Sequence, residues 1–224
     1  KCCNGAGTLT EYSCMSLLTL IKKLESNADK VFTPLGDGKM VWHLWGSGRP
    51  LVLLHGGSGA WSHWIKNIEA LSGHYRLLVP DLPGLGGSDN PPFFFDSKDY
   101  GASVPKLAET ISSGISNIIG NTAFHLCGFS FGSIVGSYIA ADVKRRLLSF
   151  TLVGASAFGW PWQGLKTPFL SMTSKMTEQE RLDVQKLNLS NAMLTSEVGY
   201  DLARLQLNNV SRARLRTHLV TETN

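Results

Sequence analysis

Apolar positions follow two alternating spacings between residues 31 and 159. Some segments are short, continuous apolar runs, which are typical of buried strands, and others carry an apolar residue every three or four positions, as one face of a helix does. The runs predict strands, beginning with a hairpin, at residues 31–35, 40–45, 51–54, 75–79, 123–127 and 148–153. The periodic segments predict helices at residues 60–71, 104–118 and 131–141.

This alternation predicts an α/β fold with a mostly parallel sheet, helices on both of its faces, and ligands at the carboxyl ends of the strands. After Gly159 the pattern changes, because residues 178–194 and 197–220 look helical with no strand between them. We therefore expect three parts: a poorly ordered leader at residues 1–30, with Met15 as the candidate true start, an α/β core at residues 31–159, and a helical cap at residues 160–224.

Composition and charge narrow the choice of partners. The chain is 43% hydrophobic and 17% charged, as ordinary globular proteins are, and its net charge of +4 comes from scattered lysines and arginines. No basic stripe indicates a nucleic-acid partner. No apolar run approaches the roughly 20 residues of a membrane span, so we expect a cytoplasmic protein without a membrane partner. The four cysteines imply no disulfide framework, and the oligomeric state stays open.

The strongest chemical signal is the sequence Gly128-Phe-Ser-Phe-Gly132, which matches the pattern G-x-S-x-G. It falls between a predicted strand and a predicted helix, where the chain must turn sharply and the serine is held in a strained conformation. The two glycines remove the Cβ atoms that would clash in such a turn. We therefore predict that Ser130 is a nucleophile whose hydroxyl projects at the top of the sheet.

A serine that attacks a carbonyl group needs hydrogen-bond donors for the developing oxyanion. The backbone N–H groups of Phe131 and Gly57 are the candidates, since Gly57 lies in the glycine-rich loop after the strand at residues 51–54. His55 is expected to brace that loop rather than act as a base. A largely apolar substrate pocket is expected over Ser130, and its predicted members, besides cap residues 160–194, are Gly56, Trp61, Trp64 and Phe129.

Three motifs, in this order and spacing, resemble the α/β-hydrolase superfamily: Leu51-Val-Leu-Leu-His-Gly-Gly-Ser-Gly59, Asp81-Leu-Pro-Gly-Leu-Gly-Gly-Ser88 and Gly128-Phe-Ser-Phe-Gly132. The chain is most similar to the branch of meta-cleavage-product hydrolases and related esterases. The resemblance implies cleavage of an ester or an activated carbon–carbon bond next to a carbonyl, with no metal and no organic cofactor. Its implied substrate is a small hydrophobic acyl or ring-cleavage compound.

In this superfamily the catalytic acid and histidine follow the nucleophile on later strands beyond the cap. We expect both to be missing here, so that the fold is incomplete and the cap truncated at Asn224. His63 and His218 are weak substitutes for the base, and we expect the chain as written to be a poor hydrolase. Asp81 and Asp89 are expected to brace backbone N–H groups of a glycine-rich loop.

Two alternatives remain. A non-catalytic binding relative would keep the sheet and lose the triad. A dinucleotide-binding oxidoreductase would use the loop Gly57-Ser-Gly-Ala-Trp-Ser62 with Asp81 at the end of the next strand, which approximates a cofactor fingerprint. That loop has Ser62 where the third glycine belongs, and the oxidoreductase hypothesis leaves the turn at Ser130 unexplained.

Overall fold

The computed structural model describes residues 16–93, 100–155, 167–194, 197–215 and 217. The strands in this part of the chain form one six-stranded sheet in the order β1-β2-β4-β3-β5-β6. β1 and β2 form an antiparallel hairpin, β2 is antiparallel to β4, and β4, β3, β5 and β6 are parallel neighbours. The strand bounds are β1 (Asp29–Leu35), β2 (Gly38–Trp45), β3 (Arg49–Leu54), β4 (Tyr75–Pro80), β5 (Phe124–Phe129) and β6 (Leu147–Val153).

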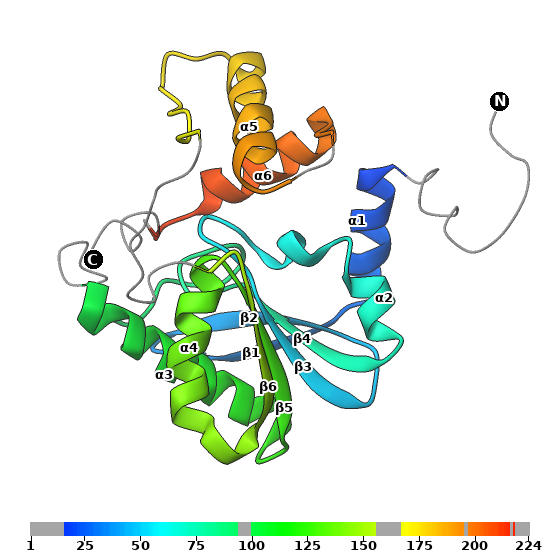
Figure 1. Ribbon diagram of the computed structural model, residues 1–224, viewed down its shortest axis with the longest axis vertical. Coiled ribbons are helices and arrows are strands. Elements are labelled where there is room, and N and C mark those ends of the chain that lie inside the picture. Colours follow the sequence, from blue (N-terminus) through cyan, green and yellow to red (C-terminus); the bar gives the residue numbers. More distant parts are fainter. Residues whose placement is uncertain (1–15, 94–99, 156–166, 195–196, 216, 218–224) are drawn as a thin grey trace, which may run out of the picture.

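Helices cover both faces of the sheet, and two more lie beyond its upper edge (Figure 1). The long helices α3 and α4 pack on one face, while α1 and α2 lie against the other, and α5 and α6 pack on each other. The mostly parallel α/β sheet with a helical cap is therefore present. The helix bounds are α1 (Leu17–Ser26), η1 (Trp61–Trp64), α2 (Ile68–Ser72), α3 (Tyr100–Ile119), α4 (Phe131–Val143), η2 (Lys144–Arg146), α5 (Glu178–Ala192) and α6 (Tyr200–Arg212).

Strand β3 shows how the two faces acquire their cores. Side chains of a strand point alternately to opposite faces of the sheet. Val52 and Leu54 pack into the core under α3 and α4, whereas Leu51 and Leu53 pack into the core with α1, η1 and α2. Because both faces are covered, five consecutive residues of β3 are buried, which is why its sequence is a continuous apolar run.

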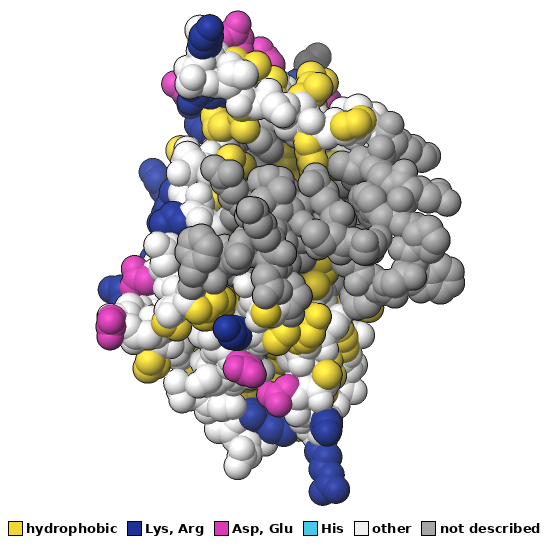
Figure 2. Space-filling view, turned by 90° about the vertical axis from the view of Figure 1, so that its left-hand side faces the viewer, with side chains coloured by type: hydrophobic (Ala, Val, Ile, Leu, Met, Phe, Trp, Pro, Cys, Tyr) yellow, Lys and Arg dark blue, Asp and Glu magenta, His cyan; other side chains and the backbone are white. Residues whose placement is uncertain are grey.

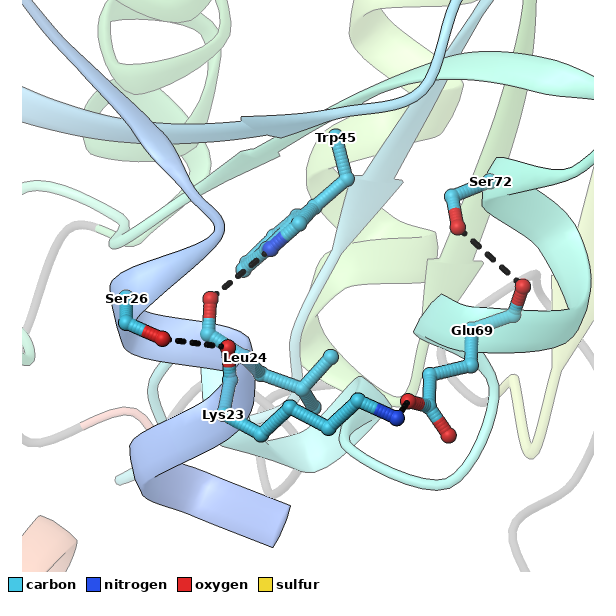
Figure 3. Close-up of polar contacts among 6 residues, drawn as sticks. All are labelled: Lys23, Leu24, Ser26, Trp45, Glu69 and Ser72. Atoms are coloured by element: carbon cyan, nitrogen blue, oxygen red, sulfur yellow. Dashed lines mark hydrogen bonds and ion pairs between the residues drawn. The ribbon is translucent and has the colours of Figure 1, made fainter.

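The expected leader boundary at residue 30 is corrected by the structure, because residues 16–30 form α1 and the start of β1. Ser16 caps α1, and Leu24 is buried in the core. The indole N–H of Trp45 donates to the Leu24 carbonyl at 2.9 Å, and Lys23 pairs with Glu69 at 2.6 Å, so α1 is tied to both β2 and α2 (Figure 3). Residues 1–15 lie outside the described part of the chain.

The helix expected at residues 60–71 is divided into η1 and α2. Residues 60–67 are joined by i to i+3 hydrogen bonds, as in His63 N to Ala60 O at 3.0 Å. A 3₁₀ turn places residues three apart on one side, and this buries Trp61 and Trp64 in the same core cluster. The last expected helix is also shorter, since it ends at Arg212 and the Arg214 N–H donates to the Gly84 carbonyl at 2.9 Å.

The surface keeps some apolar side chains exposed. They include Phe169, Leu170 and Leu187 in the cap and Leu148 and Leu152 on the edge strand β6. Figure 2 shows hydrophobic side chains among charged ones in the upper part of the molecule, where the cap lies. Among the described helices, none combines the length and the apolar character that crossing a bilayer requires.

Candidate active site

Ser130 stands at the junction of β5 and α4 in a conformation that residues with side chains rarely adopt. Its φ is +51°, and only Ser58 and Lys144 share a positive φ among the described non-glycine residues. The Ser130 N–H donates to the Val153 carbonyl of β6 at 2.8 Å, and the Ser130 carbonyl accepts from the Ser133 N–H at 2.8 Å. Hydrogen bonds on both sides thus hold the strained turn, as expected where strain is part of a functional site.

The glycines that flank Ser130 are required by close backbone packing. A Cβ atom on Gly132 would overlap the carbonyl oxygens of Leu54 and His55, and one on Gly128 would overlap the Gly132 carbonyl. Backbone atoms cannot rotate away as a flexible side chain can. The start of α4 is therefore pressed against the end of β3, which brings the turn at Ser130 beside the loop that follows β3.

That loop contains Gly56 and Gly57, which lie beside the turn at Ser130. Leu54 of β3 pairs in register with Gly128 of β5, so the two loops leave neighbouring parallel strands at the same edge of the sheet. A Cβ atom on Gly56 would lie 3.4 Å from the Ser130 Cβ and 2.9 Å from the Phe129 ring. A Cβ atom on Gly57 would lie 3.9 Å from the Phe131 Cβ and would overlap Thr217 Oγ1. The structure thus brings these predicted site residues together.

His55 braces the loop, as expected. It is fully buried, its Nδ1 lies 2.7 Å from the Gly56 carbonyl oxygen, and its Nε2 accepts from the Leu82 N–H at 3.0 Å. Nδ1 therefore carries the hydrogen and donates it to the Gly56 carbonyl. Burial lowers the pKa of His55 to about 4, because the charged ring would lose its hydration. Both ring nitrogens are occupied, so His55 has no free site for a proton from Ser130.

His63 of η1 also lies at this loop. Its Nδ1 accepts from the Gly56 N–H at 3.3 Å, and its Nε2 lies 2.9 Å from Gln206 Oε1 of α6. Burial is the main cause that lowers the pKa of His63 to about 4, and the neighbouring His55 lowers it further. The ring is neutral at physiological pH, with both nitrogens engaged.

Asp81 braces a backbone N–H group of the second glycine-rich loop, as predicted, whereas Asp89 binds strand β2 instead of the loop. Asp81 Oδ1 accepts from the Trp61 N–H and Asp81 Oδ2 from the Gly87 N–H, each at 2.8 Å. Asp89 Oδ2 accepts from the Lys39 N–H at 2.8 Å. Asp81 therefore joins η1 to the loop after β4 and is not placed as a ligand for a ribose.

A cavity of about 360 Å³ lies between η1, the carboxyl ends of β5 and β6, and the cap helices. Phe129 and Trp64 line it, whereas Gly56, Trp61 and Ser130 itself are not among its lining residues, so the cavity lies beside the turn at Ser130. The Trp61 ring packs instead against Trp45, with centroids 5.5 Å apart. The cap contributes apolar side chains: Leu189, Met193, Leu194, Leu202 and Leu205. Cap residues 160–166 of the predicted pocket lie outside the described residues.

His125 of β5 has its Nδ1 2.7 Å from Ser149 Oγ of the neighbouring strand β6. His218, the other weak candidate for the base, lies outside the described residues. Within the described ranges, no group of His, Cys, Asp or Glu is arranged to hold a metal ion. Sequence analysis missed Gln206 and Asn209, two buried amides of α6 that contact η1. In the sequence, Gln206 and Asn209 follow Ala203 at intervals of three residues, which places all three on one side of a helix. A polar face turned to solvent has the same spacing, so this pattern could not identify them as buried.

Comparisons with known proteins place the chain among hydrolases. Residues 49–189 match the family model described as the alpha/beta hydrolase fold. A pimeloyl-[acyl-carrier protein] methyl ester esterase of Vibrio parahaemolyticus is 27% identical over 175 residues, which are 76% of this chain and 64% of that relative. A soluble epoxide hydrolase of Corynebacterium sp. is 35% identical over 97 residues, which are 43% of this chain and 31% of that protein. This chain therefore spans less than two thirds of each relative.

Among solved structures, a lipase-like protein of Acinetobacter baumannii AYE superimposes with a TM-score of 0.67. The match covers 97% of this chain and 71% of that protein, at 21% sequence identity. At this identity the likeness concerns the fold alone.

Proposed function

Because this chain belongs to the α/β-hydrolase fold family, we propose that it is a serine-type hydrolase in which Ser130 is the nucleophile. The observation that carries the proposal is the strained turn at Ser130, with φ +51°, pressed against the glycine loop by Gly128 and Gly132. Structural strain without a function is costly, and such turns are found where a hydroxyl must project from the sheet.

In the proposed reaction Ser130 Oγ bonds to the substrate's carbonyl carbon. The carbonyl oxygen becomes an oxyanion, which the N–H groups of Gly57 and Phe131 stabilise. The bond from that carbon to the leaving group then breaks, and the leaving group takes up the proton that the Ser130 hydroxyl lost. In a second step water releases the acyl group as an acid and returns a proton to Ser130 Oγ. His55 and His63 each use both ring nitrogens, so neither is assigned as the base that takes the hydroxyl proton.

The substrate class follows from the cavity beside Phe129. Its cap-side lining is mostly leucine and methionine, with the amides of Gln206 and Asn209 on the η1 side, which suits an apolar acyl group rather than a sugar or nucleotide. Ester cleavage is supported by the esterase relative, whose name gives a methyl ester as its substrate. An activated carbon–carbon bond next to a carbonyl would react through the same acyl transfer. The chemistry calls for no metal and no organic cofactor.

The test is covalent labelling of Ser130 by a fluorophosphonate, followed by peptide mass spectrometry. We expect labelling of Ser130 in the wild-type chain, slowly because no base is assigned to its hydroxyl, and none in Ser130→Ala. The weak p-nitrophenyl ester turnover expected of this chain should be lost in the same variant. Ser137→Ala is the matched control, because its hydroxyl bonds only to the α4 backbone at Ser133 and should leave labelling unchanged. Labelling of another residue, or turnover that persists in Ser130→Ala, would contradict the proposal.

A further inference from the structure

We propose that Gln206 of the cap helix α6 is a positioning residue that holds the oxyanion loop, here residues 55–59, in its working geometry through His63. The inference rests on the proposed hydrolase function, since it assigns the loop as the source of an oxyanion donor. It makes the shape of this loop depend on the cap being seated on the core.

The contacts run in a line from the cap to the loop. Gln206 Oε1 lies 2.9 Å from His63 Nε2, and His63 Nδ1 lies 3.3 Å from the Gly56 nitrogen. Gln206 Nε2 also donates to the Ser58 carbonyl at 3.2 Å. One side chain of α6 therefore holds the loop at two points, directly at Ser58 and through an imidazole at Gly56.

The direction of each hydrogen bond follows from the chemistry of the groups. A backbone N–H can only donate, so His63 Nδ1 must be the unprotonated nitrogen. In the neutral ring the hydrogen is then on Nε2, which donates to Gln206 Oε1. The Gln206 amide is oriented to match, because its NH₂ group faces the Ser58 carbonyl. The arrangement requires a neutral His63, and protonation of Nδ1 would set two donors against each other.

Two imidazoles fix Gly56 from its two sides. His63 holds its N–H, and His55 donates to its carbonyl oxygen at 2.7 Å. The Gly56 carbonyl and the Gly57 N–H belong to one planar trans peptide, so they point in opposite directions. Fixing the Gly56 carbonyl therefore fixes where the proposed oxyanion donor points. Without His63, the two free torsions of Gly56 would be restrained from one side only.

Packing alone does not explain Gln206. Gln206 is only 7% exposed. Glutamine and asparagine are rarely so deeply buried, because a buried amide without hydrogen-bond partners is costly. Asn209, one turn later, is 8% exposed and donates to Ser62 Oγ at 3.1 Å and to Gln206 Oε1 at 3.1 Å. An apolar residue would fill the same space without requiring partners, so the amide at position 206 is placed for its hydrogen bonds.

The experiment compares Gln206→Met with Ala203→Gly in the full chain by NMR. Methionine keeps the length of Gln206 and removes its acceptor, while glycine at position 203, buried one turn earlier, loosens the same helix without removing a hydrogen-bonding side chain. We expect exchange of the Gly56 amide to rise at least about tenfold in Gln206→Met and to stay within about twofold in Ala203→Gly. The amide of Leu126, in the buried strand β5, should be unchanged in both variants.

A turnover measurement follows the same variants on p-nitrophenyl acetate, whose short acyl group does not need the cavity. A misplaced oxyanion donor weakens binding of the transition state rather than of the substrate. In Gln206→Met, kcat should therefore fall about tenfold while KM stays within about twofold. Equal exchange of the Gly56 amide in wild type and Gln206→Met would overturn the proposal. An equal rise in both variants would also overturn it, since it would show only a loosened helix.

The wild-type protein gives an independent check that needs no variant. A nitrogen–proton NMR correlation between the His63 ring nitrogens and the ring's carbon-bound protons reports which nitrogen carries hydrogen. At about pH 7 it should show the neutral ring with hydrogen on Nε2. A ring protonated on Nδ1 would overturn the proposal whether or not Gln206→Met folds. The exchange and tautomer results do not depend on turnover, whereas failure of fluorophosphonate labelling at Ser130 would refute the hydrolase function separately.

Discussion

His55 combines complete burial with two hydrogen bonds, and this makes one residue responsible for a pH-dependent share of stability. Its pKa is lowered from 6.5 to about 4 because burial disfavours the charged ring, and the bond to Gly56 opposes this shift only in part. The unfolded chain therefore binds a proton near pH 6.5 that the folded ring does not bind. His63 is shifted in the same direction for the same main reason.

The contribution of His55 to the free energy of unfolding should accordingly have its full value above about pH 6.5 and fall as the pH drops toward about 4. Below that pH the contribution is lost and does not change further. The loss from His55 is on the order of 3 kcal/mol. Urea unfolding at about pH 7 and about pH 4 measures it, with His55→Asn as the comparison, since its amide does not titrate. A pH dependence as steep in His55→Asn as in wild type would contradict this origin.

At the scale of elements, Asp81 joins two segments that follow neighbouring strands. Its two carboxylate oxygens accept from the Trp61 N–H at the start of η1 and from the Gly87 N–H in the loop after β4. Asp81 is 3% exposed, so water cannot replace either bond. The start of η1 and the loop after β4 are therefore held to a single carboxylate.

We predict that Asp81→Ala lowers the free energy of unfolding by about 2 to 4 kcal/mol, because it leaves two inward-facing N–H groups without an acceptor. Asp81→Asn should cost roughly half as much, since one oxygen remains. Asp37→Ala, in the exposed turn of the first hairpin, is the matched control and should change stability by less than about 0.5 kcal/mol. The measurement is chemical denaturation at about pH 7, and equal losses at positions 81 and 37 would refute the role given to Asp81.

At the scale of the whole molecule, the cavity exists only because the cap sits over the core. Trp64 and Phe129 come from the core, whereas Leu189 and Leu205 come from α5 and α6. The same interface carries the hydrogen bonds from Gln206 and Asn209 to η1. Polar contacts thus join the cap to η1, and the apolar residues of the cap close the space beside Phe129.

We predict that Leu205→Trp fills part of this cavity and shifts preference toward short acyl groups. The kcat/KM for p-nitrophenyl octanoate should fall about tenfold, equivalent to about 1.4 kcal/mol, while that for the acetate ester changes less than about twofold. Leu187→Trp is the control, because Leu187 is 50% exposed on α5 and lies away from the cavity lining. Equal losses for both esters would show that the cavity does not hold the acyl group.

Much of this architecture could be predicted because it depends on local pattern. The apolar run of β3 and the glycines around Ser130 are dictated by burial on both sheet faces and by backbone overlap, which act over a few residues. The division of residues 60–71 into η1 and α2 was not predicted, because helical spacing and a 3₁₀ turn both place Trp61 and Trp64 on one side. That residues 16–30 are folded as α1 and the start of β1 was not predicted either, because α1 is held by Trp45 and Glu69, which are distant in the sequence.

The sequence by itself determined the layers of the fold, the turn at Ser130 and the bracing of Gly56 by His55 and of Gly87 by Asp81, because sterics and short-range hydrogen bonding leave few alternatives at such positions. Only the tertiary structure decided that His63 meets Gln206, 143 positions later, and that Trp64 rather than Trp61 lines the cavity. A histidine and a glutamine carry no mark of their partner along the chain. Their pairing is set by how the cap packs on the core, where a buried amide must find the group that satisfies it.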